Sequence, residues 1–238
     1  MIIDFHSHIL PGIDDGANDV AVANKMLAME KVSGVDAIVA TPHFYMSEQS
    51  LESFLEKREE AYKKINDAAE NKNVKIHLGA EVYFTHSLSD IDLEKLCIAD
   101  TSYMMIELPY QKLTRNFICS FKSFAGSISP DINLILAHAE RYLNFTDEES
   151  LYEILDSDML VQLNCGSFKL FSPHLKFMNN LISNGMAHLL GTDCHNITSR
   201  APNMGIARKA IEKKFSHSEF IRFMDNAKAV LDGEIIGD

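Results

Sequence analysis

The N-terminal stretch Ile2-Ile3-Asp4-Phe5-His6-Ser7-His8 is a short, β-rich apolar run that ends in two histidines one residue apart. It is the first of seven such runs in the chain. The other six are Ala37 to Thr41, Lys75 to Leu78, Tyr103 to Leu108, Ile132 to Ala137, Met159 to Leu163 and His188 to Leu190. Most are nearly continuous in apolar residues rather than alternating, which is typical of strands covered on both faces.

Amphipathic stretches with helical spacing separate the runs and follow the last one. They span Asn18 to Val32, Leu51 to Ala69, Arg115 to Phe124, Glu148 to Leu155, Leu175 to Ser183, Ala201 to Lys214 and Ser218 to Leu231. This repeated alternation of strand and helix predicts a parallel sheet with crossover helices. No Gly/Ser/Pro-rich linker and no repeat divides the chain. We therefore expect one domain over residues 1–238, an α/β fold with a closed or nearly closed barrel.

The composition narrows the classes of function. The chain has 238 residues, 46% of them hydrophobic, and a formal net charge of −12. A nucleic-acid-binding protein would carry a basic surface, and an anionic membrane would repel this chain, so neither partner is expected. The N-terminus has no basic segment, and no apolar run reaches the roughly 18 residues of a membrane span. The four cysteines are scattered without a Cys-x-x-Cys pair, which indicates reduced thiols and a cytoplasmic location.

Histidines and carboxylates end or follow every run except the sixth. They are His6, His8, His43, Glu81, Glu107, His138, Asp193 and His195. Active sites of parallel α/β barrels form at the carboxyl ends of the strands, so we expect these side chains on one rim. Side chains at i and i+2 of an extended strand point the same way. His6 and His8 should therefore aim at one place.

This rim predicts a cluster of metal ions. Imidazole and carboxylate groups together suit Zn, Mn or Fe, and a carboxylate such as Glu81 can bridge two ions. Paired ions are common machinery for phosphoryl displacement. The remaining histidines are expected at the surface or in the core.

The motif Asp4-Phe5-His6-Ser7-His8-Ile9-Leu10-Pro11-Gly12-Ile13-Asp14-Asp15-Gly16 resembles the opening motif of the polymerase-and-histidinol-phosphatase (PHP) superfamily. More narrowly, it is similar to that of bacterial capsule-synthesis protein-tyrosine phosphatases. Later blocks agree in order: Ala40-Thr41-Pro42-His43-Phe44, Gly79-Ala80-Glu81-Val82-Tyr83, Ile106-Glu107, Ala137-His138-Ala139-Glu140-Arg141-Tyr142 and Gly191-Thr192-Asp193-Cys194-His195-Asn196. The resemblance runs from Met1 to about the last helix.

The resemblance implies a distorted seven-stranded (β/α)7 barrel with two or three metal ions, typically Mn²⁺, with Fe or Zn as alternatives. Carried over by motif, the ligands fall into three groups: His6, His8, Glu81 and Asp193; Glu81, Glu107 and His138; and Asp15, His43 and His195. Asp15 enters only through the resemblance, because Asp14-Asp15-Gly16 is by itself typical of a turn and helix cap. Arg141 and Arg200 are implied as catalytic residues, since guanidinium groups bind phosphate oxygens in a planar, bidentate manner.

The implied function is hydrolysis of phosphotyrosine by attack of a metal-bound hydroxide in line with the leaving oxygen. The implied substrate is a flexible tail of a membrane-associated tyrosine kinase of capsular or exopolysaccharide synthesis. A phenolate leaving group, with a pKa of about 10, needs little protonation. That suits a rim without a spare general acid. Phe44 and Tyr45, next to His43, could flank the phenyl ring.

Other functions are compatible with parts of the pattern. The superfamily also implies a histidinol-phosphate phosphatase or an exonuclease, and the negative charge disfavours the latter. Cys194 to Arg200 matches the Cys-x5-Arg spacing of cysteine-dependent tyrosine phosphatases, but this loop contains no glycine and Ala201-Pro202 follows it. A metal-binding scaffold without activity would turn over no phosphoester.

Overall fold

All seven expected runs are strands in this computed structural model, which describes residues 1–236 apart from the side chains of residues 70 and 71. They are β1 (Ile3–Ser7), β2 (Ala37–Ala40), β4 (Lys75–Leu78), β6 (Tyr103–Glu107), β7 (Asn133–Leu136), β8 (Met159–Asn164) and β9 (Leu189–Gly191). Two short strands are additional, β3 (His43–Phe44) and β5 (Glu81–Tyr83). The expected count of seven is therefore not confirmed, since the described residues form nine strands.

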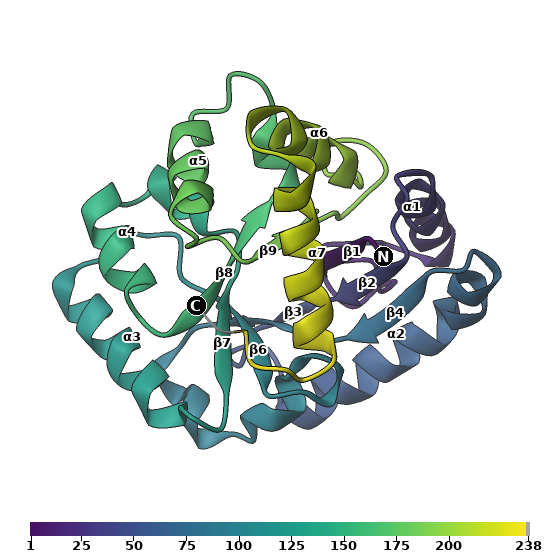
Figure 1. Cartoon of the computed structure of the whole chain (residues 1–238). Helices are drawn as coiled ribbons and strands as arrows, with labels where there is room; N and C mark the ends of the chain where they lie inside the picture. Colours follow the sequence, from purple (N-terminus) through teal and green to yellow (C-terminus); the bar gives the residue numbers. More distant parts are fainter. Residues whose placement is uncertain (237–238) are drawn as a thin grey trace.

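The strands form a curled sheet in which every pairing is parallel (Figure 1). One part has the order β1-β2-β4 and the other the order β3-β5-β6-β7-β8-β9. The break between β2 and β3 lies at Thr41-Pro42, where proline has no N–H to donate to a neighbouring strand. The break between β4 and β5 lies at Gly79-Ala80. On the side of β1 that does not pair with β2, Asp193 N donates to His6 O at 2.7 Å. The end of β9 therefore lies beside β1.

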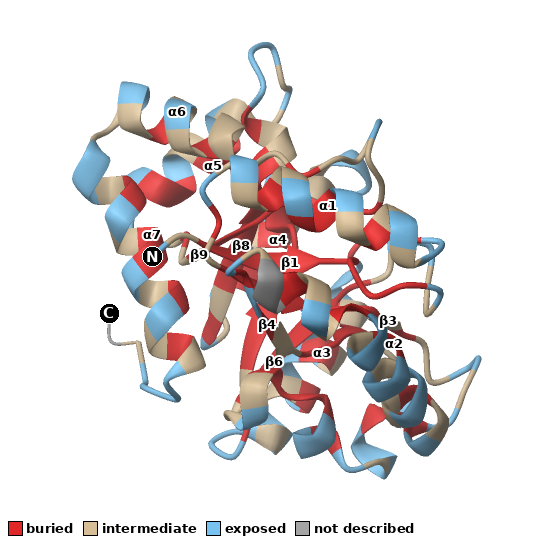
Figure 2. Ribbon diagram, turned by 90° about the vertical axis from the view of Figure 1, so that its right-hand side faces the viewer, coloured by how far each residue is buried: buried red, intermediate tan, exposed pale blue. Residues whose placement is uncertain are grey.

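Seven α-helices among the described residues cover the outside of the sheet (Figures 1 and 2). They are α1 (Val20–Val32), α2 (Leu51–Asn71), α3 (Arg115–Ile128), α4 (Glu148–Leu155), α5 (Leu175–Ser183), α6 (Met204–Lys214) and α7 (His217–Leu231). Short 3₁₀ turns are η1 (His86–Asp90), η2 (Leu93–Leu96), η3 (Ile98–Asp100), η4 (Ala139–Asn144) and η5 (Cys165–Phe168). Among the described residues, no helix has the length and apolar character needed to cross a bilayer.

Apolar strand residues fill two sides of the sheet, which is why the runs are nearly continuous in apolar residues. Met105 and Ile135 belong to an inner cluster. Their neighbours Met104, Ile106 and Leu134 pack in the larger cluster that includes the helices. Figure 2 shows the buried strands at the centre and the helices with exposed outer faces. This core leaves the carboxyl ends of the strands as the place where polar side chains gather.

Candidate active site

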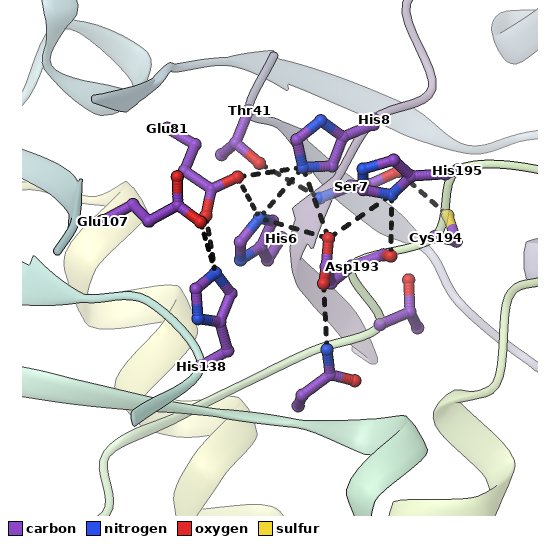
Figure 3. Close-up of polar contacts among 12 residues, drawn as sticks. His6, Ser7, His8, Thr41, Glu81, Glu107, His138, Asp193, Cys194 and His195 are labelled. Atoms are coloured by element: carbon purple, nitrogen blue, oxygen red, sulfur yellow. Dashed lines mark hydrogen bonds and ion pairs between the residues drawn. The ribbon is translucent and has the colours of Figure 1, made fainter. Parts of the chain in front are cut away.

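The structure brings the nine expected metal-site residues together at the carboxyl ends of the strands. Figure 3 labels all of them except Asp15 and His43. All of them are buried except Asp15 and the partly buried His43. They come from segments spread over most of the chain, so the fold alone makes them neighbours. The expected residues are His6, His8, Asp15, His43, Glu81, Glu107, His138, Asp193 and His195.

Four of these residues form the first expected group around the end of β1. The Nε2 atoms of His6 and His8 lie 3.1 Å apart, and each lies 3.1 Å from Glu81 Oε2. Asp193 Oδ1 lies 3.3 Å from His8 Nε2. Two ring nitrogens and two carboxylate oxygens converging in this way match the donors that a transition-metal ion takes.

Asp14 fixes which nitrogen of His8 faces this group. Its Oδ2 lies 2.7 Å from His8 Nδ1 and also accepts the backbone N–H of His43 at 3.0 Å. A carboxylate accepts, so Nδ1 carries a proton, and Nε2 is the nitrogen that offers a lone pair to a metal ion when the ring is neutral. That is the arrangement in which a carboxylate orients a metal-binding histidine.

Glu81 lies at the centre of the site. Its Oε1 lies 2.7 Å from His138 Nε2, and its Oε2 lies 3.2 Å from His43 Nδ1, in addition to the contacts with His6 and His8. Glu107 Oε1 lies 3.6 Å from His138 Nε2. These positions agree with the second expected group and with a carboxylate between two ions.

The third expected group is His43, His195 and Asp15. Asp15 Oδ1 lies 3.2 Å from His195 Nε2 and 3.6 Å from His43 Nε2, although the Asp15 side chain is 64% exposed. His195 Nδ1 donates to the backbone carbonyl of Asp193 at 3.0 Å, which leaves the lone pair on Nε2. That Nε2 is buried and meets no hydrogen-bond donor, since the Asp15 carboxylate near it can only accept. A buried lone pair without a donor fits a metal ligand.

The pKa values of the buried carboxylates and of His138 also favour the binding of cations at the site. Burial lowers the pKa of His138 to about 4, so its ring is neutral, the form that binds metal. Burial, together with the charge of Glu81, raises the pKa of Glu107 to about 8. Burial would also raise the pKa of Glu81, but the surrounding His6, His138 and His8 hold it well below its usual range. Closely packed carboxylates of this kind are stabilised as anions by positive charge.

Both expected arginines reach the site, and both contact Asp193. Arg200 Nη2 lies 2.8 Å from each carboxylate oxygen of Asp193, and Arg141 Nη2 contacts Oδ2 of the same group. The family resemblance implies that both guanidinium groups lie near the metals. It does not indicate that both contact Asp193. Asp193 therefore faces the ligand group on one side and two arginines on the other.

A cavity of about 420 Å³ opens over these residues. Six of the nine expected ligands and the two arginines line it, together with Tyr45, Tyr110 and Phe145. The rings of Tyr110 and Phe145 lie 5.2 Å apart, and the Tyr45 ring lies 5.1 Å from that of His43. Phe44 is fully buried against Phe54 and does not line the cavity, so the expectation that it flanks a substrate ring is wrong.

Comparison with known proteins shows the family. The family described as "Capsular polysaccharide synthesis, CpsB/CapC" matches residues 2–232. This chain belongs to the CpsB/CapC family. The family resemblance inferred from the motifs is thereby confirmed.

Two curated relatives of this CpsB/CapC chain match along nearly its whole length. The tyrosine-protein phosphatase YwqE of Bacillus subtilis is 28% identical, over 99% of this chain and 93% of that protein. The tyrosine-protein phosphatase CpsB of Streptococcus pneumoniae is 28% identical, over 99% of this chain and all of that protein. A crystal structure from a study of YwqE and CpsB, described there as metal-dependent tyrosine phosphatases, superposes with a TM-score of 0.83. The two sequences are 24% identical, and the superposition covers 99% of this chain and 96% of the crystallised chain. The two proteins therefore share a fold.

The cysteine-based alternative fails in this CpsB/CapC chain. Cys194 is fully buried, and its Sγ lies 3.2 Å from Ser7 Oγ (Figure 3). Burial raises the pKa of this thiol well above its usual range, with Glu30 and Asp4 acting in the same direction. The residue does not line the cavity. A buried, neutral thiol cannot act as the nucleophile, since the thiolate is the reactive form.

Three polar residues around the ligands were not among the expected site residues. Asp14 orients His8, Asn164 donates to Asp193 Oδ2 at 3.1 Å, and Gln162 contacts His6 and His138. The sequence pattern predicts a turn and a helix cap at Asp14-Asp15-Gly16. The turn is present, since Asp14 Oδ1 accepts the N–H of Gly16, but the residue that caps α1 is Asp19. A polar side chain inside the apolar run of β8 is the signal that would have pointed to Gln162.

Proposed function

We propose that this chain is a metal-dependent protein-tyrosine phosphatase of capsular or exopolysaccharide synthesis. The observation that carries the proposal is that members of all three ligand groups, two arginines and three aromatic rings line one cavity. The names of the relatives and their full-length match support it. The ligand groups suit metal-assisted displacement at phosphorus, and the aromatic walls suit an aryl phosphate.

The proposed metal ligands are those expected from the motifs. His6, His8, Glu81 and Asp193 would hold one ion; Glu81, Glu107 and His138 a second; and Asp15, His43 and His195 a third. Mn²⁺ is the proposed metal, with Fe and Zn as the alternatives that imidazole and carboxylate also suit. When bound, such ions supply Lewis acidity to the phosphoryl oxygens and to the attacking water.

The proposed roles of the other side chains follow from their positions. Arg141 and Arg200 would bind the equatorial phosphate oxygens, and their shared contact with Asp193 holds both guanidinium groups at the cavity before substrate enters. Tyr45 would pack against the phenyl ring of the substrate. A phenolate leaving group, with a pKa of about 10, leaves with little help from a general acid.

The proposed substrate is a phosphotyrosine in a flexible segment, such as the tail of a membrane-associated tyrosine kinase. The exposed Asp15 and the partly exposed Arg200 place the cavity at the surface, where an extended segment reaches it more readily than a folded surface does. The net charge of −12 argues against nucleic acid as the substrate.

We also propose that the chain acts as one domain, with the nine strands of the described residues in the seven positions of a distorted (β/α)7 barrel. The proposal is supported by the continuation of the β2–β4 pairing into the β3–β5 pairing, where Glu81 N donates to Pro42 O at 3.0 Å. The contact of β1 with the end of β9 supports it on the other side. All four cysteines are free, which supports a cytoplasmic location.

A comparison of substrates tests the proposed function. The purified chain with added Mn²⁺ is assayed on sequence-matched phosphotyrosine and phosphoserine peptides and on histidinol phosphate. We expect the highest kcat/KM on the phosphotyrosine peptide. A preference of tenfold or more for histidinol phosphate, about 1.4 kcal/mol in transition-state binding, would instead make the chain a small-molecule phosphatase.

Tyr45→Ala is expected to lower kcat/KM on phosphotyrosine peptides by about 2- to 10-fold, since an aromatic pair contributes roughly 0.5–1.5 kcal/mol. Activity on the phosphoserine peptide should not fall, because that substrate has no ring to pack. Tyr45→Phe keeps the ring and should behave as the wild type. Equal losses on both peptides would show that Tyr45 supports His43 rather than the substrate.

Cys194→Ser is expected to retain most of the phosphatase activity, since the buried thiol touches no proposed substrate position. The measurement is kcat on a phosphotyrosine peptide together with the metal content. Cys97→Ser, at a second buried thiol, is the matched control. Loss of nearly all activity with the metals still bound would restore the cysteine mechanism.

A further inference from the structure

Gln162 is a fully buried amide in β8 that belongs to none of the ligand groups. Its side chain contacts two residues that do, His6 and His138. We propose that Gln162 is a positioning residue whose single oxygen fixes the ring of His6 and the backbone of His138. This inference rests on the metal site of the proposed function.

The orientation of the amide follows from its partners. Gln162 Oε1 lies 2.7 Å from the backbone N of His138. A backbone N–H can only donate, so the atom that it meets must be the oxygen. At the other end, Nε2 donates to the carbonyl of Leu163 at 2.7 Å. A flipped amide would lose both hydrogen bonds.

This orientation determines the tautomer of His6. Gln162 Oε1 lies 3.1 Å from His6 Nδ1. Because the oxygen only accepts, Nδ1 carries the proton, and the lone pair of the neutral ring lies on Nε2. Nε2 is the atom that faces His8 and Glu81, each at 3.1 Å. Histidines that bind metals commonly donate the other ring N–H to such a partner.

The same oxygen supports the backbone of His138. This residue has φ +33° and ψ +54°, a left-handed conformation that is unfavourable for residues with a side chain. Its N–H donates to Gln162 Oε1, while its Nε2 contacts Glu81. Figure 3 shows that the rings of His6 and His138 both approach Glu81. One amide therefore ties together two ligands that are far apart in the sequence.

Gly191 makes this arrangement sterically possible. A Cβ at this position in β9 would lie 2.3 Å from the Cβ of His6 and 2.9 Å from Nε2 of Gln162. Real Cβ atoms do not approach other atoms so closely, so a side chain here would push His6 and Gln162 away. The missing side chain at Gly191 lets the amide reach from β8 past β9 to β1.

The first test needs no variant. The wild-type chain is loaded with Zn²⁺, which is diamagnetic, and its imidazole N–H groups are assigned by ¹H–¹⁵N NMR. We expect a slowly exchanging proton on Nδ1 of His6. A His6 ring protonated on Nε2, or one with no protected Nδ1 proton, would overturn the proposal.

The second test measures Mn²⁺ affinity by titration calorimetry. Gln162→Met keeps the length of the side chain but removes the acceptor, and it should weaken Mn²⁺ binding about 10- to 100-fold. Gln162→Glu keeps an acceptor oxygen, so its Mn²⁺ affinity should be no more than tenfold weaker than that of the wild type. Val161→Ala is the control for packing, because Val161 is the neighbouring buried residue on β8 and packs in the larger core cluster. It should lower the melting temperature without weakening Mn²⁺ binding.

The outcomes separate this inference from the proposed function. If the wild type binds Mn²⁺ and Gln162→Met binds it equally well, the positioning role is wrong and the metal site stands. An equal loss in Gln162→Met and Val161→Ala would also contradict the role, since it would reflect packing alone. If the wild type binds neither Mn²⁺ nor Zn²⁺, the metal site itself is wrong, and the inference fails with it.

Discussion

Glu81→Gln is expected to lower kcat on phosphotyrosine peptides by roughly 10³-fold or more. Loss of a group that only orients a ligand costs about 10- to 100-fold, and Glu81 lies at the centre of the ligands. Its two oxygens lie within 3.2 Å of four histidines: His6, His8, His43 and His138. Glutamine has nearly the same shape but replaces one oxygen with an NH₂ group, which cannot bind a cation. The measurement is kcat together with metal content by elemental analysis, which should fall as well.

Glu30→Gln is the matched control for this change. Glu30 is also fully buried, in α1, but it lies outside the proposed metal groups. Burial and the charge of Asp4 raise its pKa well above its usual range, so it is a neutral acid that an amide resembles. We expect the control to keep its metals and most of its activity. Wild-type turnover by Glu81→Gln would show that the carboxylate does not hold the ions together.

Arg141→Ala is expected to lower kcat/KM on the same peptides by about 10²- to 10³-fold, the usual cost of losing a group that stabilises transition-state charge. Metal content should be unchanged, because Asp193 keeps its contacts with Arg200 at 2.8 Å and with Asn164 at 3.1 Å. Arg141→Lys should recover only part of the activity, since an ammonium group cannot bind two phosphate oxygens in a planar fork.

Metal analysis of Arg141→Ala separates two roles of this arginine. Intact metal content with slow turnover supports direct contact with the phosphate. Loss of metal would mean that Arg141 acts by holding Asp193, and its proposed role would then be wrong.

The order of strands and helices could be predicted because the apolar runs are local and continuous. Lys75 to Leu78, Glu148 to Leu155 and Leu175 to Ser183 have the same bounds in the sequence analysis and in the structure. The short strands β3 and β5 could not be predicted, since they depend on how the chain pairs beyond Pro42 and Gly79 rather than on hydrophobicity. The apolar runs end at Thr41 and Leu78, so the pattern alone does not indicate the short strands β3 and β5 that follow them.

The convergence of the histidines and carboxylates could be predicted for a similar reason. Each follows a strand, and the strands of a parallel sheet end at the same edge. The residues that hydrogen-bond to the proposed metal ligands could not be predicted in this way. Gln162 meets His6 across 156 positions of sequence. Both arginines share Asp193, which depends on side-chain conformations that spacing does not determine. Asp15 required the family resemblance, because locally it is one of two aspartates in a turn.

Metal removal and reconstitution on one sample tests the central claim most directly. The purified chain is treated exhaustively with chelator, and phosphotyrosine hydrolysis and metal content are measured before and after stepwise addition of Mn²⁺. We expect activity to disappear with the metal and to return as two or three ions bind per chain. Full hydrolysis of phosphotyrosine by protein that contains no metal would contradict the account.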